Sequence, residues 1–221
     1  MTKRVLMLCT LLSASASRAA WPALSASVGY ESQLYTSQRY DLVDADDFLP
    51  MLRVAAGTGF ELGPGHLDVD VAFTTGASRE SAHGGQAAAD LWLRGVQVGG
   101  LYRYGLFSWL EPYARLGVGW DWATLQLTAS TPLRQTVSHV SGLGVVGVQL
   151  PVRMGTASNK GRLPFMVFDL GGGYVVRPDY AFDALKADPV TKTEPVASGS
   201  VNLGSVPMHG GLLRVLVTVR W

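Results

Sequence analysis

The most constraining feature of the sequence is the alternation of apolar and polar residues over long segments. Residues 67–74 read Leu-Asp-Val-Asp-Val-Ala-Phe-Thr, which places the bulky apolar residues on one face of an extended chain and both aspartates on the other. Segments 110–122 and 213–221 alternate in a similar way. Because successive side chains of a β-strand point to opposite faces, this period of two predicts strands with one apolar and one polar face.

The pattern predicts strands at residues 24–35, 48–61, 66–76, 90–104, 110–124, 136–150, 163–177 and 208–221. Two of these segments, 90–104 and 136–150, alternate poorly, and we expect a bulge or a partial mis-register there. Strands of about ten or more residues exceed the five or six that are usual in a soluble sheet. They suit a tilted crossing of a membrane.

Short and long connections mostly alternate between the predicted strands. The short ones are residues 62–65, with Gly63-Pro64-Gly65, and 105–109, while 151–162 is longer than the pattern requires. The long ones are 36–47, 77–89, 125–135 and 178–207. An even number of strands brings both termini to one end and all the long connections to the other. Short periplasmic turns opposite long extracellular loops are typical of outer-membrane barrels, so we predict an all-β, eight-stranded, antiparallel up-and-down transmembrane β-barrel.

Composition excludes several other classes of protein. The chain has 221 residues, of which 48% are hydrophobic and only 16% charged, so intrinsic disorder is excluded. The formal net charge of +1 gives no support for binding nucleic acid, which needs a basic face. The 26 glycines fit a small barrel, where inward glycines leave room for long charged side chains.

Residues 1–19 have the layout of a secretory signal peptide, which leaves 20–221 as the barrel domain. Lys3 and Arg4 precede a short apolar segment, and small residues follow it. Cleavage after Ala16 and cleavage after Ala19 both satisfy the preference for small residues. The single cysteine, Cys9, falls within this segment, so we expect no disulfide and no thiolate metal site in the mature chain.

If the apolar faces meet lipid, the alternate faces carry ionisable side chains into the barrel. This predicted lumen charge network comprises Glu31, Arg53, Asp68, Asp70, Glu111, Arg115, Asp121, Asp169, Arg177 and Arg214, with Gln33 and Glu61 on the same faces. Charges in so narrow an interior must be paired or hydrated, so we expect arginine–carboxylate ladders. Eight strands enclose a space that side chains just fill, which favours a plug over a narrow ion pathway.

A family resemblance rests on the signal peptide, on two strands of related sequence and on the terminal Trp221. Both strands read Pro-aromatic followed by Leu-Gly-x-Gly-aromatic, at 112–120 and 164–174. They resemble the small eight-stranded barrels of the OmpA-like transmembrane barrel superfamily. The resemblance implies a place in the bacterial outer membrane, contact with its lipid and lipopolysaccharide, and insertion by the barrel-assembly machinery. The assembly signal it implies is Leu213, Val215, Val217, Val219 and Trp221, although many relatives end in Phe.

The predicted function is a structural or surface-interaction role through extracellular loops, the largest being 178–207, with an unidentified ligand. One alternative is a narrow passive channel for water, ions or small solutes. Another is a soluble periplasmic barrel of lipocalin type, in which the apolar faces point inward to a ligand. No cofactor or metal is predicted, because the four histidines lack ligand spacing and the aspartates at 44–47 lack the glycine and glutamate of an EF-hand loop.

Enzymatic activity is not predicted, although two motifs have to be weighed. Residues 142–147 match G-x-G-x-x-G but have no surrounding βαβ unit, so they are interpreted as a glycine-rich strand. His139-Val140-Ser141 resembles the His-x-Ser pair of barrels that deacylate lipid A, since residues two apart share a face and can form a nucleophile–base pair. Such barrels have a downstream Glu; here the nearest downstream acid is Asp169. A lipid A-modifying hydrolase therefore remains a minor alternative.

Overall fold

The computed structural model describes residues 23–35, 47–82, 87–128, 132–153, 165–183, 185–187, 202 and 204–221. The predicted signal peptide, with Cys9, lies outside these residues, as do Asp44 and Asp46. The eight long strands are β1 (Ala23–Leu34), β2 (Phe48–Leu62), β3 (Gly65–Ala82), β4 (Ala87–Tyr104), β5 (Glu111–Thr128), β6 (Leu133–Arg153), β7 (Phe165–Val176) and β11 (Gly210–Arg220). No helix among the described residues is long and apolar enough to span a membrane.

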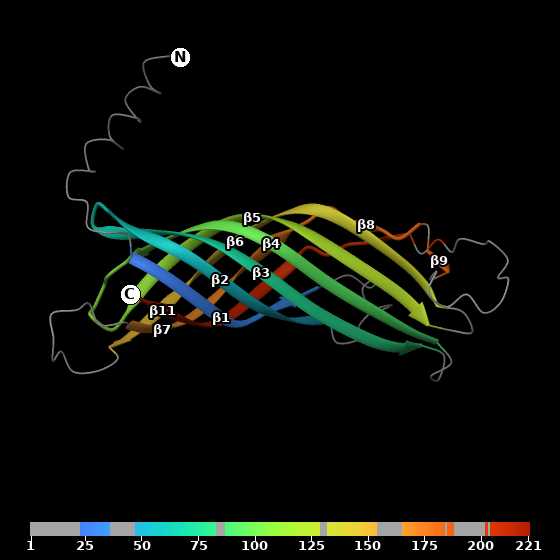
Figure 1. Ribbon diagram of the computed structural model, residues 1–221, viewed down its shortest axis with the longest axis horizontal. Coiled ribbons are helices and arrows are strands. Elements are labelled where there is room, and N and C mark those ends of the chain that lie inside the picture. The colour runs from blue at the N-terminus through green and yellow to red at the C-terminus, as the bar shows by residue number, and fades with distance from the viewer. Residues whose placement is uncertain are drawn as a thin grey trace, which may run out of the picture.

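The eight long strands form a closed antiparallel ring (Figure 1). Each pairs with its neighbours in the chain, and β1 closes the ring by pairing with β11 from Ser25↔Arg220 to Leu34↔Gly211. The tight turn between β2 and β3 is Gly63-Pro64, where Gly63 has φ of 58°, as the first position of a type II′ hairpin requires. The structure confirms the predicted eight-stranded up-and-down β-barrel.

The register of the ring fixes its tilt and width. Following paired residues once around the ring from Gly142 of β6 leads to Val152 of the same strand, a shift of ten residues. With about 3.3 Å per residue and about 4.8 Å between strands, this shift tilts the strands by roughly 40° and gives a backbone radius of roughly 8 Å. Such a lumen admits side chains and little else.

The strands on one side of the barrel are longer than those on the other side. This difference was not predicted from the sequence. Strands β3, β4 and β5 have 18 residues each and β6 has 21, whereas β1 and β7 have 12 and β11 has 11. The predicted long connections at 77–89 and 125–135 are therefore mostly strand. Strands β4 and β6 also pair residue for residue with their neighbours in the printed registers, so the expectation of a bulge or a partial mis-register there was wrong.

We call the connector between β7 and β11 the cap. It explains why β3, β4, β5 and β6, which form the tall wall, are longer than the other strands, and why apolar and polar residues alternate poorly in β4 and β6. It contains the short strands β8 (Tyr180–Ala181), β9 (Lys186–Ala187) and β10 (Ser205–Val206). β9 extends the sheet along the free edge of β6, and β8 pairs with β10. The upper inward face of the tall wall is apolar because it packs against this cap instead of enclosing water. Leu91 and Leu93, which flank Trp92 in the sequence and share the inward face of β4, are buried in that contact.

Candidate functional site

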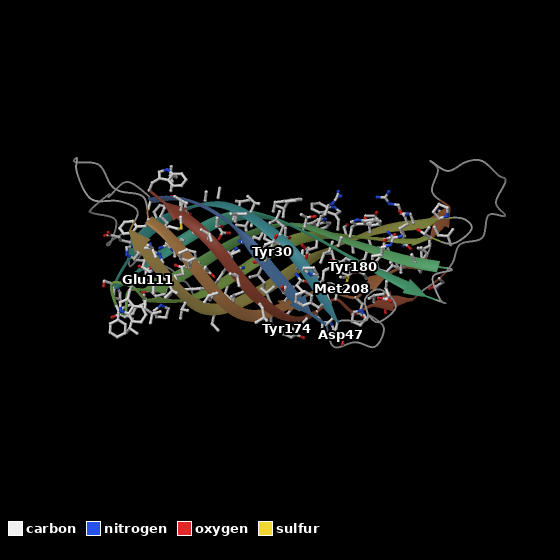
Figure 2. All side chains as sticks on the ribbon, turned by 90° about the horizontal axis from the view of Figure 1, so that it is seen from below. Tyr30, Asp47, Glu111, Tyr174, Tyr180 and Met208 are labelled. Atoms are coloured by element: carbon white, nitrogen blue, oxygen red, sulfur yellow. The ribbon has the colours of Figure 1, made fainter. Side chains whose placement is uncertain are left out.

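The interior of the barrel is the part of the molecule in which ionisable groups gather. Ion pairs and hydrogen bonds divide it into three layers along the axis, followed by an apolar cluster under the cap. Figure 2 shows Glu111 at the end of the barrel that carries the chain terminus and the short turns, with Tyr180 and Met208 toward the other end.

The lower layer lies nearest the chain terminus and joins two arginines to acids and an amide. Arg103 donates from Nε to Asp68 Oδ2 and from Nη1 to Glu111 Oε2, at 2.9 Å each. Arg220 donates to the same Glu111 oxygen at 3.2 Å and also binds Gln149. Side-chain exposure in these ion pairs is 9–17%, so solvent reaches this layer only partly.

The middle layer is a network of three arginines and two carboxylates. Arg115 holds Asp70 in a two-pronged bond, and Arg53 donates to the same carboxylate at 3.0 Å. Arg214 donates through Nε to Glu31 at 2.9 Å, and Arg53 lies 3.6 Å from the same carboxylate. The three arginine side chains and Glu31 are each only 1% exposed and Asp70 is 18% exposed, so the ion pairs between them offset the cost of burying these charges.

The middle and lower layers are linked by Asp169, and a small cavity lies between them. The Tyr113 hydroxyl donates to Asp169 at 2.7 Å and Gln149 donates at 2.9 Å, so this carboxylate is held by neutral donors. The cavity has a volume of about 40 Å³ and is lined in part by Asp70, Asp169 and Arg214. Since roughly 10–15 Å³ of such space holds one water, the cavity takes only a few water molecules.

The upper layer consists of one ion pair, in which the arginine also donates to an amide side chain and to a backbone oxygen. Arg177 donates from Nε to Asp121 Oδ2 at 2.6 Å, and both side chains are 0% exposed. Its Nη1 also donates to Gln33 Oε1 at 2.6 Å and to the backbone oxygen of Met208 at 3.2 Å. Because Arg177 follows β7 and Met208 precedes β11, the ion pair anchors both ends of the cap to the barrel wall.

The apolar cluster closes the lumen above the upper layer. The barrel contributes Tyr35, Leu49, Met51, Leu91, Leu93, Ala123 and Leu125, and the cap contributes Tyr180, Phe182, Leu185, Val206 and Met208. The rings of Tyr180 and Phe182 are stacked, with centroids 6.4 Å apart. Burial raises the pKa of the Tyr180 phenol, which therefore stays neutral.

Inward glycines make room for the charged layers. A Cβ at Gly95 would overlap Asp121 Oδ1, and one at Gly99 would overlap the Arg115 guanidinium. A larger residue at Gly95 would push Asp121 away from Arg177, and one at Gly99 would push Arg115 away from Asp70. These close approaches give a physical reason for part of the high glycine content.

All ten residues of the predicted lumen network lie inside the barrel, at the positions just described. Glu61 shares their parity but is exposed at the rim of β2. The sequence analysis missed Arg103 and Arg220, although Arg220 lies on the same face as Arg214, six residues further along one strand. With these two, six arginines face six acids in the three layers: Arg53, Arg103, Arg115, Arg177, Arg214 and Arg220 against Glu31, Asp68, Asp70, Glu111, Asp121 and Asp169.

His139 and Ser141 face the interior beside the cap, not the lipid. The rings of His139 and Tyr180 are packed edge to face, with centroids 4.8 Å apart. Neither His139 Nε2 nor Ser141 Oγ has a hydrogen-bond partner among the described residues. A lipid held on the outer face could not reach them, so the geometry argues against a lipid hydrolase. Nor do any three His, Cys, Asp or Glu side chains in the described part of the chain gather as a metal ion requires.

The outer face of the ring is a continuous apolar belt. Exposed side chains around it include Val28, Val54, Val71, Val98, Val118, Val146, Phe168 and Leu213. The residues of the expected assembly signal lie on this face, with Leu213, Val215 and Trp221 each at least half exposed. In water such a belt would be a large exposed apolar patch, whereas in a bilayer it is the surface that a barrel needs. The closed ring, the apolar exterior and the charged interior together define a small eight-stranded transmembrane β-barrel, the architecture typical of outer-membrane barrels.

Known proteins resemble the chain in structure rather than in sequence. Neither a protein-family model nor a curated protein matches the sequence. Among solved structures the chain is similar to Neisserial surface protein A, with 13% identity, a TM-score of 0.48, and 90% of this chain and 94% of that chain covered. It is similar to Ail, the attachment invasion locus protein of Yersinia pestis, in complex with the heparin analogue sucrose octasulfate, with 13% identity, a TM-score of 0.49, and 90% and 99% covered. It is also similar to a major outer membrane protein from Thermus thermophilus, with 15% identity, a TM-score of 0.48, and 90% of this chain and 98% of that chain covered. The assignment to the class rests on the geometry of the chain itself.

Proposed function

We propose that the protein is a closed, non-conducting barrel with a structural or surface-interaction role, carried by the part that rises beyond the membrane. The observation that supports this most is the filled interior, from the lower layer of ion pairs to the apolar cluster under the cap. A lumen with a backbone radius of roughly 8 Å and three layers of paired side chains leaves no continuous water path.

The cap provides the surface through which such a protein would act. Its apolar side chains point into the barrel, while Asp179, Asp183 and Lys186 are exposed. Gln135 of the tall wall donates to the backbone oxygen of Ala181, which helps to hold the cap in place. The result is a polar surface built on a packed core, suited to contacts with a partner outside the cell.

A narrow channel is the alternative, and the cavity of about 40 Å³ between charged layers favours it. Such a cavity would become part of a pathway if the upper ion pair and the cap moved aside. The two functions differ in whether the wild-type protein passes solutes.

Efflux from liposomes separates them. Vesicles containing the folded wild-type barrel should release potassium no faster than vesicles without protein. Valinomycin added at the end of each trace should release the remaining potassium, which shows that the vesicles were sealed and loaded. Efflux through the wild type well above that of vesicles without protein would contradict the proposal and favour the channel.

Two further parts of the proposal concern biogenesis. Residues 1–19 would direct export and be removed, and the outward face of β11 ending at Trp221 would be read by the barrel-assembly machinery. Mass spectrometry of the barrel isolated from outer membranes should give an N-terminus after Ala16 or Ala19. An intact N-terminus at Met1 would contradict the signal peptide.

A further inference from the structure

The outward face of the barrel carries very little charge. Outward positions on the eight long strands, within the part of the chain that the structure describes, are charged only at Arg79, Asp90, Arg94 and Arg134. Arg79 and Asp90 are directly opposite in register and form an ion pair of 3.3 Å. Arg134 is the second residue of β6, at the tip of the tall wall. Arg94 is the charge nearest the apolar belt.

Arg94 marks the upper limit of that belt. It is exposed, and its register partners are Thr75 on β3 and Trp122 on β5. The next row toward the chain terminus is wholly apolar, with Phe73, Val96 and Trp120 exposed in register. From Arg94 to the exposed Tyr104 at the other end of β4 there are ten residues, about 25 Å along the barrel axis at a tilt of roughly 40°. An apolar band of about 25 Å flanked by aromatic girdles is what a barrel of this class presents to a bilayer.

At this height Arg94 has a free guanidinium with room for an anion. Arg94 has no ion pair or hydrogen bond to the described residues, in contrast to Arg79 with Asp90. A guanidinium against the apolar boundary is unfavourable unless it is hydrated or paired, and a phosphate matches its planar pair of donors. Because the tall wall and the cap lie beyond this row, the row faces the outer leaflet.

We propose that Arg94 binds a phosphate of the phosphorylated glycolipid of the outer leaflet, lipid A, with the Trp122 and Trp92 rings lying at the same interface. The bidentate guanidinium–phosphate contact holds one glycolipid against the β4–β5 surface and fixes the depth of the barrel in the membrane.

The test is native mass spectrometry of the full-length mature barrel, released from detergent after titration with bisphosphorylated lipid A. Arg94→Gln should weaken the binding of the first lipid at least about tenfold, as expected for one lost charge-assisted contact. Arg134→Gln is the matched control, because it removes an outward arginine from the tip of the same wall, and it should bind as the wild type does. Each variant is compared as the heat-modifiable folded form, so that misfolding is not mistaken for lost binding.

The lipid series identifies the occupant. Dephosphorylated lipid A should bind the wild type as weakly as phosphorylated lipid A binds Arg94→Gln. Equal binding of phosphorylated lipid A by the wild type and Arg94→Gln would overturn the site, and so would an equal loss in Arg134→Gln. Equally tight, Arg94-dependent binding of phosphatidylglycerol would keep the phosphate contact but overturn lipid A as its occupant.

Discussion

Replacing Asp121 by Asn should leave a fully buried arginine side chain of the barrel, Arg177, without its counter-charge. Arg177 and Asp121 are both fully buried, and their bond of 2.6 Å is the charged contact of the upper layer. Removing one partner of a buried pair costs about 3–5 kcal/mol. Asparagine still offers an oxygen to Arg177 Nε, and Gln33 and Met208 remain as acceptors, so we expect the lower end, about 3 kcal/mol.

The assay is urea unfolding of the barrel in phospholipid vesicles, followed by the fraction of heat-modifiable protein. With a slope of about 2 kcal/mol per molar urea, a loss of about 3 kcal/mol lowers the midpoint by roughly 1.5 M. The control is Asp90→Asn, whose partner Arg79 is 73% exposed, and which should cost under about 1 kcal/mol. In the double variant Asp121→Asn/Arg177→Gln, the loss should be smaller than the sum of the single losses. Equal effects of Asp121→Asn and Asp90→Asn, or strict additivity, would refute the reasoning.

Three further predictions concern packing and assembly. Phe182→Ala removes a fully buried ring from the cap and should cost about 3–5 kcal/mol, seen as faster proteolysis of the cap in folded protein; unchanged proteolysis would contradict the packed cap. Gly95→Ala should displace the Asp121 carboxylate and lower the urea midpoint, while Gly142→Ala, where a Cβ meets nothing within 4 Å, should leave it unchanged; equal midpoints would show that Gly95 is not needed for space. Trp221→Ala should reduce the folded fraction in outer membranes without changing the urea midpoint of refolded protein, and normal folded levels in cells would remove Trp221 from the assembly signal.

The architecture was predictable because period-two alternation depends only on which face each side chain occupies. The polarity of a residue and its position in the alternation can both be read locally, as for Asp68 and Asp70 on one face and Val69 and Val71 on the other. In such segments the sequence alone predicts the strand and its two faces. The predicted strand at 66–76 ended six residues early because its extension to Ala82 is stabilised by pairing with β4, from Ala77↔Trp92 to Ala82↔Ala87, and such long-range contacts leave no local pattern.

The interior was predictable only in part. Arg214 and Arg220 share a face, so the second could have been found by extending the same alternation to the end of the chain. Leu91 and Leu93 could not have been assigned to the interior, because the rule that inward means polar fails where the cap covers the wall. Which arginine binds which acid was also beyond the sequence, since Arg177 and Asp121 are 56 residues apart and meet only through the ring.

The central claim, a lumen closed by paired charges and an apolar cap, is tested most directly by single-channel recording of the wild-type barrel in planar bilayers. The account predicts no unitary current steps at moderate voltage. Regular unitary steps from the wild type, with the cap intact, would contradict it.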